Sequence, residues 1–399
     1  MMRRQRFKVS PRIRLATILH GLIVALASTT VSCGGERGEP ESAWAGERSQ
    51  LPGGAVLVSN PATGIWDDQP GWTLEETLRI GSLEGEGPDV FGRVAALEVD
   101  PAGRIYVFDG FARELRTFGP DGGFVTGFGR RGSGPGEFES VIGLSVAPDG
   151  AVWAVDGPNV RYTAIHGEQV ATYRRASPLY RLPWVGGFTA EGTLYDAVVL
   201  PGQSGEFLVR VDTAGTATDT FPIVTPELDV PRFGTMTFPL PYAPKVLRAF
   251  DRRGYAWTAV THEYRLVQMS FDGDTLMIVT RDVTAPPLGS AEQDSVRRYV
   301  RQLEAQFGVG VSDDVIPGSA PILRWFLVDD AGDLWVARAG PAGTTSLDVF
   351  DDAGRYLGEV ELGFEVASGG VPIVRDEHLY AVTEGELGVP VIVRSRIGR

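Results

Sequence analysis

The chain contains short stretches in which apolar and polar residues alternate, separated by turns rich in glycine, proline and aspartate. Residues 97–99 (Leu-Glu-Val) alternate in this way and are followed by the turn 100–103 (Asp-Pro-Ala-Gly). Residues 104–108 then form a β-branched and aromatic run, residues 114–118 alternate again, and residues 124–128 follow a second glycine-rich turn. Alternation with a period of two between turn residues predicts β-strands. This part of the chain is therefore expected to form four short antiparallel strands.

The same pattern recurs 47 positions later. The first copy is marked by Gly85, Gly87, Pro88, Phe91, Val94, Leu97, Val99, Pro101, Gly103, Tyr106 and Asp109, and the second by Gly132, Gly134, Pro135, Phe138, Val141, Leu144, Val146, Pro148, Gly150, Trp153 and Asp156. A fixed period of this length indicates structural units that bury their apolar faces only against one another. Four strands in each unit are typical of a β-propeller blade.

Fainter copies of the turn and the following aromatic strand continue towards the C-terminus. The strand aromatics mark six repeats, at Tyr106, Trp153, Tyr195, Trp257, Trp335 and Tyr380. The last repeat stops after its third strand, and residues 76–81 precede the first complete repeat. We predict that these residues supply the missing strand and close the ring. The expected fold is all-β, a six-bladed propeller of four-stranded antiparallel blades over residues 55–399.

The order of these features resembles the NHL-type six-bladed β-propeller family. The shared pattern is a Gly-rich loop, a Phe, an apolar strand, an Asp-x-x-Gly turn and an aromatic-Val-x-Asp strand. The similarity is good over residues 81–173 and weaker from there to residue 399. Residues 112–115 (Ala-Arg-Glu-Leu) depart from the family's Asn-x-Arg-Ile. Because this fold hosts many unrelated functions, the resemblance implies the fold and no particular ligand.

The first 33 residues have the features of an export signal. Residues 3–14 carry six basic side chains, residues 15–31 are mainly apolar, and Cys33 is the only cysteine of the chain. The arrangement resembles the start of a bacterial lipoprotein with Cys33 as the lipidated residue, although Thr30 stands where that family prefers leucine. Cleavage after residues 25–27 and an uncleaved membrane anchor are the alternatives.

Residues 34–54 are polar and rich in glycine, glutamate and proline, which predicts a flexible tether. Loss of residues 1–32 removes six basic and no acidic residues, so the net charge falls by six, from −14 to −20. Nucleic acids and anionic lipid headgroups both require a positive patch, so neither is an expected partner. We expect an exported monomer that a lipid anchor holds at a bacterial membrane, facing the periplasm or the cell surface.

Two connections between repeats are much longer than the others. These insertions, residues 221–246 and 281–321, join the fourth strand of one blade to the first strand of the next. Connections of this class emerge on one face of a propeller, and these two belong to successive blades. We therefore expect them to lie side by side as a lid over one sector. The insertions could instead have a purely structural role and cover an exposed ring edge or the channel mouth. The sequence supports this role and a ligand-binding or partner-binding role equally.

The second insertion contains the one well-marked helix. Ser290 and Gln293 predict a capping box at its start, and Gly308 predicts its end. The apolar residues of the expected buried face are Val296, Tyr299, Val300, Leu303 and Phe307.

The turns between second and third strands should open on the lid-bearing face. Together with the first insertion they provide the candidate ligand-binding residues Asp109, Arg113, Asp156, Asn159, Arg232, Phe233, His262, Arg338 and Glu384. For Asp109 and Asp156 taken singly, capping of their own turns is the stronger interpretation.

Enzymatic chemistry has little support in the sequence. The chain contains no nucleophile elbow, phosphate loop or His-Glu-x-x-His helix. His166 and His378 fall at turns on the face opposite His262, so a three-histidine zinc site is not expected. Oxygen ligands could hold calcium as in gluconolactonase-like propellers, and the candidates are Asp109, Asp156, Asn159 and Glu384.

These observations favour a non-enzymatic binding protein without a cofactor. Its partner would be a protein, peptide or glycan bound on the lid-bearing face. The alternative is a calcium-dependent lactonase-type hydrolase.

Overall fold

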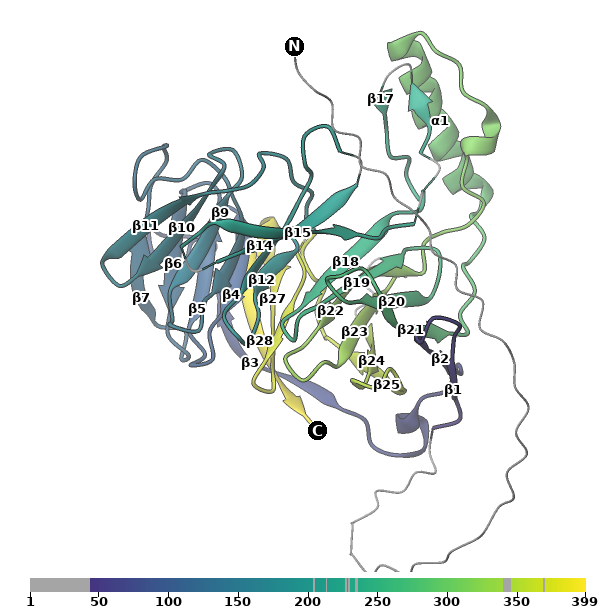
Figure 1. Cartoon of the computed structure of the whole chain (residues 1–399), viewed down its shortest axis with the longest axis horizontal. Helices are drawn as coiled ribbons and strands as arrows, with labels where there is room; N and C mark the ends of the chain where they lie inside the picture. Colours follow the sequence, from purple (N-terminus) through teal and green to yellow (C-terminus); the bar gives the residue numbers. More distant parts are fainter. Residues whose placement is uncertain are drawn as a thin grey trace, which may run out of the picture. The chain divides into compact units, whose positions relative to one another are not determined.

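The computed structural model describes residues 44–203, 205–212, 214–226, 228, 230–233, 236–339, 346–368 and 370–399. Within them, six four-stranded antiparallel sheets form the blades of a propeller (Figure 1). Blades 1 to 3 consist of β4 (Val94–Val99), β5 (Ile105–Asp109), β6 (Glu114–Phe118) and β7 (Phe124–Phe128); β8 (Val141–Val146), β9 (Val152–Asp156), β10 (Arg161–His166) and β11 (Gln169–Arg174); and β12 (Gly186–Phe188), β13 (Leu194–Val198), β14 (Glu206–Val211) and β15 (Ala217–Ile223).

Blades 4 to 6 continue the same antiparallel order. They consist of β18 (Val246–Asp251), β19 (Tyr255–Val260), β20 (Arg265–Met269) and β21 (Thr275–Arg281); β22 (Leu323–Val328), β23 (Leu334–Arg338), β24 (Ser346–Phe350) and β25 (Tyr356–Glu361); and β26 (Ile373–Arg375), β27 (His378–Glu384), β28 (Pro390–Gly398) and β3 (Thr73–Ile80). The first strands of successive blades contact one another, so they line the centre of the ring. The predicted fold class is confirmed.

An N-terminal strand closes the ring, as the sequence predicts. β3 pairs antiparallel with β28, with Ile80 opposite Ile392 and Thr73 opposite Gly398. It is the fourth strand of blade 6. The start and the end of the propeller are therefore held together by a ladder of backbone hydrogen bonds.

Blade 4 is larger than expected, because residues of the predicted tether 34–54 belong to it. β1 (Glu47–Gln50) pairs antiparallel with β2 (Val56–Asn60), and β2 pairs in parallel with β21. Val58 is fully buried in the same cluster as Trp257. The apolar run 55–58 thus covers the outer edge of blade 4, and the sheet of this blade includes residues before residue 55.

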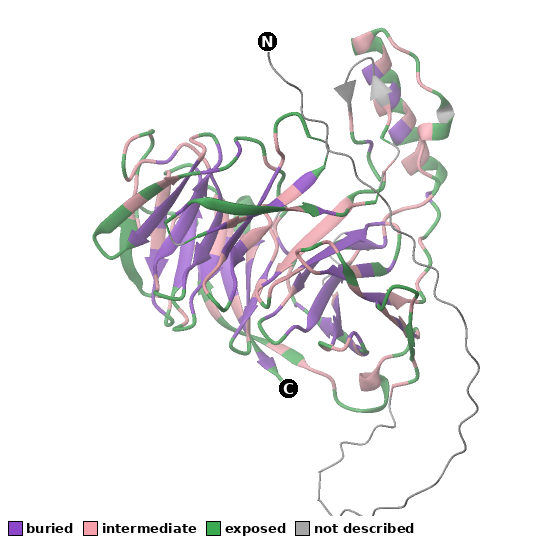
Figure 2. Ribbon diagram, viewed as in Figure 1, coloured by how far each residue is buried: buried purple, intermediate pink, exposed green. Residues whose placement is uncertain are grey.

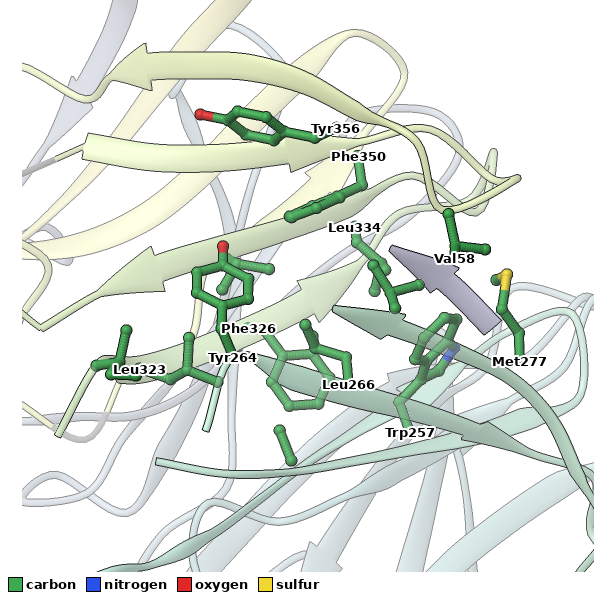
Figure 3. Close-up of a cluster of buried hydrophobic side chains, with 14 residues drawn as sticks. Val58, Trp257, Tyr264, Leu266, Met277, Leu323, Phe326, Leu334, Phe350 and Tyr356 are labelled. Atoms are coloured by element: carbon green, nitrogen blue, oxygen red, sulfur yellow. The ribbon is translucent and has the colours of Figure 1, made fainter. Parts of the chain in front are cut away.

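The core consists of apolar side chains packed between neighbouring blades. Figure 3 shows one such cluster, in which Trp257 and Leu266 of blade 4 face Phe326 and Leu334 of blade 5. The second strands are almost entirely buried, whereas outer strands such as β7 and β11 are mostly exposed (Figure 2). This gradient explains why second strands carry continuous apolar runs and outer strands alternate.

The two insertions pack against each other, as predicted. We call residues 224–245 and 282–322 the cap. In it, Leu240 of the first insertion lies against the buried face of α1 (Ser290–Phe307), formed by Val296, Val300 and Leu303. β16 (Arg232–Phe233) and β17 (Met236–Thr237) form a small ribbon beside α1, and the two insertions stand together beyond the blades (Figure 1).

The ends of α1 agree with the sequence only in part. Gly308 ends the helix with a left-handed φ of 67°, as predicted. The capping box is wrong by one residue, because Gly289 is the N-cap and no side chain caps the helix. Among the described residues, no helix is both long and apolar enough to cross a membrane.

Candidate functional site

Asp109 and Asp156 occupy equivalent places at the ends of β5 and β9, and both are buried. Asp109 accepts hydrogen bonds from the backbone N–H groups of Gly92 (3.0 Å) and Phe111 (2.8 Å). Asp156 accepts hydrogen bonds from the N–H groups of Glu139 and Ser140, both at 3.1 Å. Each carboxylate therefore ties its own turn to the connection that enters its blade.

Arg113 and Asn159 lie in the same two turns and also bond locally. Arg113 donates to the Gly110 carbonyl oxygen at 2.6 Å. Asn159 donates to Asp156 at 2.7 Å and accepts a hydrogen bond from Ser133 at 3.1 Å. These hydrogen bonds stabilise the shapes of the turns that follow β5 and β9.

The remaining candidates lie on other blades. His262 Nε2 donates to the Ser319 carbonyl oxygen (3.1 Å) and so ties blade 4 to the cap. Arg338 forms ion pairs with Asp348 and Glu359, and Glu384 is exposed at the end of β27. The backbone of Arg232 and Phe233 forms β16, but their side chains, like Cys33, lie outside the described part of the chain.

A cavity of about 180 Å³ opens on the same face as these turns and the cap. Its lining comes from the connection from β11 to β12, the end of β13 and the beginning of β14, the beginnings of β18 and β22, and the connection from β25 to β26. Because the first strands line the ring centre, their beginnings mark the mouth of the central channel on the cap-bearing face. We call this cavity the mouth pocket.

The walls of the mouth pocket are mainly apolar. Trp325 and Phe326 come from β22, and Val246 and Leu247 come from β18. The connections add further apolar lining residues: Leu182, Pro183, Val185, Ala367 and Val371.

Charged residues lie at the pocket in an uneven ratio of three arginines to one glutamate. Glu206, only 4% exposed, forms ion pairs with Arg248 of β18 and, at 3.6 Å, with Arg181. Arg324 lies at the rim and is paired with Glu365 at 3.2 Å. Burial lowers the pKa of Arg248; Glu206 opposes this effect, and the positive charge of Arg181 adds to it. The pocket is thus a positively charged site on an acidic protein.

A second charged cluster lies at the opposite ends of the first strands. Arg375 forms ion pairs with Glu98 (3.4 Å) and Asp330 (3.2 Å), and Arg252 lies 3.6 Å from Asp330. Burial raises the pKa of Glu98, and the positive charge of Arg375 opposes that rise. These contacts tie blades 1, 4, 5 and 6 together across the ring.

None of the nine candidate residues lines the mouth pocket. Among the turns between second and third strands, the turn between β13 and β14 contributes lining residues, Ala197 and Glu206, but none of the predicted residues lies in that turn. The overlooked signal was the position of Val246–Arg248 and Arg324–Phe326 directly after the long insertions. Residues at that point of a propeller repeat are the ones that face the channel mouth.

Metal-ligating side chains do not gather in the described residues. No group of three or more His, Cys, Asp or Glu side chains there is arranged so that it could hold a metal ion.

Comparison with known proteins gives similarity in structure only. No family model matches the chain, and no curated protein matches it. A solved exported protein from Bacteroides fragilis is 12% identical, with a TM-score of 0.53 over 86% of this chain and 100% of that chain. At this identity the likeness shows a shared fold.

Two propeller enzymes are more distant. Virginiamycin B lyase from Staphylococcus aureus is 11% identical, with a TM-score of 0.44 over 82% of this chain and 99% of that one. Aldose sugar dehydrogenase from Streptomyces coelicolor, in its PQQ-bound form, is 12% identical with the same TM-score and the same coverage. Neither likeness indicates an activity for this chain.

Proposed function

We propose that this chain is an exported binding protein of the NHL type, without catalytic activity, whose ligand or partner group enters the mouth pocket. The observation that carries the proposal is the pocket itself. It is concave, mainly apolar and lined by a few convergent charged groups, which is the usual form of a ligand site.

The surface around the pocket suits a larger partner as well. Phe111, Leu182 and Leu387 are exposed large apolar side chains in connections on the cap-bearing face. Of these three, Leu182 lines the mouth pocket, and an exposed apolar side chain beside a pocket is typical of an interaction surface. A peptide or a segment of a protein, or a glycan, would contact them while one of its groups fills the pocket.

The N-terminal sequence supports export and membrane attachment. The basic residues 3–14, the apolar run 15–31 and the lone Cys33 are the features on which this part of the proposal rests. The fold shared with an exported propeller protein is compatible with it. We propose a lipid on Cys33 and a location outside the cytoplasm.

Binding is favoured over calcium-dependent hydrolysis by the bonding of the candidate calcium ligands. Asp109 and Asp156 already accept backbone hydrogen bonds from the loops that they shape. Such contacts are sufficient reason for a buried carboxylate at the end of a strand. No observation of comparable weight favours the hydrolase.

Native mass spectrometry tests the proposal. The protein would be purified from the cells that naturally produce it, as wild type and as Ser368→Trp. Ser368 is exposed and lines the mouth pocket, so an indole at this position fills the space without disturbing the core. We expect a bound small molecule or peptide on the wild-type protein and its loss from the variant.

The matched control is Ala102→Trp, which adds the same side chain to an exposed turn between β4 and β5, on the opposite face. It should retain the ligand. Equal retention by both variants would place the ligand elsewhere and contradict the proposal.

A further inference from the structure

We propose that the mouth pocket recognises a carboxylate attached to an apolar body, with Arg181 and Arg248 binding the carboxylate. This inference rests on the proposed function and adds the chemistry of the ligand. Two sources share this chemistry: a free organic acid and the C-terminal residue of a peptide.

The first argument is the incomplete bonding of Arg248. Its side chain is only 15% exposed, and its Nε is buried without a hydrogen-bond partner among the described residues. A buried donor without a partner loses the free energy of hydration, so such groups normally have a partner. Because this Nε is closed off from the pocket, a ligand oxygen would bind the outer edge of the guanidinium, where Arg248 lines the pocket beside Glu206.

The second argument is the charge balance. Glu206 is shared by Arg248 and Arg181, so one carboxylate faces two guanidinium groups. Arg324 adds a third positive charge at the rim, balanced by Glu365 outside the lining. The pocket therefore favours an anion, and the planar arginine fork matches the two oxygens of a carboxylate.

The third argument is the apolar part of the pocket lining. Trp325, Phe326 and Leu182 offer aromatic and aliphatic surface, which a fully polar anion such as inorganic phosphate would leave unused. With about 10–15 Å³ for each water-sized group, the cavity holds roughly a dozen such groups. The matching ligand is a short aliphatic or aromatic carboxylic acid.

Arg181 provides the cleanest variant. Its side chain is 62% exposed, so its replacement leaves the core intact, whereas loss of Arg248 alone would leave Glu206 without its closest partner. Arg130 is the matched control, because it is also exposed, lies in a connection between blades and is paired with a glutamate, Glu137. Neither Arg130 nor Glu137 lines the pocket.

Isothermal titration calorimetry would compare 4-phenylbutyrate with 4-phenylbutanamide, and N-acetyl-Ala-Ala-Phe with its C-terminal amide. We expect each acid to bind at least tenfold more tightly than its amide. Arg181→Gln should weaken binding of the acids at least threefold and leave the amides within twofold, and Arg130→Gln should change neither. The tighter acid identifies the source, free acid or peptide.

The double variant Arg248→Met with Glu206→Gln removes both charges of the buried pair and should abolish the preference for acids. Equal binding of acids and amides by the wild type would overturn the carboxylate inference while leaving the pocket as a ligand site. Failure of all four compounds to bind would also overturn it. The bound molecule sought by native mass spectrometry decides the proposed function separately.

Discussion

At the scale of single residues, equivalent positions of the sequence repeat form equivalent hydrogen bonds. Asp109 and Asp156 lie 47 residues apart, and so do the loop residues Gly92 and Glu139 that donate to them. The backbone hydrogen bonds that both aspartates accept support their interpretation as turn-shaping residues. Their use as ligand-binding residues is still a prediction that no observation supports.

Replacing Asp156 by alanine should destabilise the fold. The substitution leaves the N–H groups of Glu139 and Ser140 without their acceptor, and we expect a loss of about 2–4 kcal/mol. Urea unfolding followed by tryptophan fluorescence measures this loss. Asp149→Ala, in an exposed turn of the same blade, should cost less than about 1 kcal/mol. Equal stability of the two variants would contradict the structural role of Asp156.

Asp333 should make stability depend on pH. Burial, with the nearby negative charge of Asp329, raises the pKa of Asp333 from 3.8 to about 6. The folded state therefore holds this proton more tightly than the unfolded state, and the resulting stabilisation is complete below pH 4 and is lost as the pH rises to 6. This rise of about two pKa units corresponds to a change on the order of 3 kcal/mol, since one pKa unit corresponds to about 1.4 kcal/mol.

The variant Asp333→Asn isolates this effect. It should be more stable than the wild type at pH 7.5 and gain little at pH 4, as measured by urea unfolding at both values. The same difference at both pH values would show that the carboxyl group does not titrate in this range.

At the scale of elements, the sequence predicts correctly those strands, turns and helix faces that depend on neighbouring residues. Alternating strands, glycine turns and the buried face of α1 all depend on residues near one another in sequence, and these predictions are confirmed. The sequence places residues 56–60, which form β2, within the propeller but does not predict their pairing. Their partner strand β21 lies more than 200 residues away and pairs in parallel, so no local pattern reports it. The mouth pocket was missed for the same reason, since distant segments assemble it.

The three N-terminal strands should contribute differently to the stability of the propeller: β1 and β2 less, and β3 more. A chain beginning at residue 62 lacks β1 and β2 and loses Val58 from the core, so it should fold with a lower melting temperature. A chain beginning at residue 82 also lacks β3, which leaves blade 6 with three strands and the ring open. We expect no cooperative thermal transition by circular dichroism for this shorter chain. Similar melting of both chains would show that β3 does not secure the ring.

At the scale of the whole molecule, the proposal joins an exported chain, an acidic surface and a positively charged pocket on one face. The net charge of −14 for the full chain repels anions in general. Three arginines at the channel mouth reverse that sign locally. A ligand with both a carboxylate and an apolar body is selected by this contrast.

Replacing Cys33 by alanine tests the proposed membrane attachment. The wild-type protein should enter the detergent phase in Triton X-114 partitioning, because the proposed acyl chains on Cys33 are apolar. Cys33→Ala should remain in the aqueous phase if residues 1–32 are still removed. A variant that stays in the detergent phase would indicate an uncleaved N-terminal anchor.

The most direct test of the account is a crystal structure of the protein with 4-phenylbutyrate. We predict electron density for the compound in the mouth pocket, with its carboxylate hydrogen-bonded to Arg181 and Arg248 and its ring against Trp325 and Phe326. Density for the compound at another place, with the mouth pocket holding only water, would contradict the central claim.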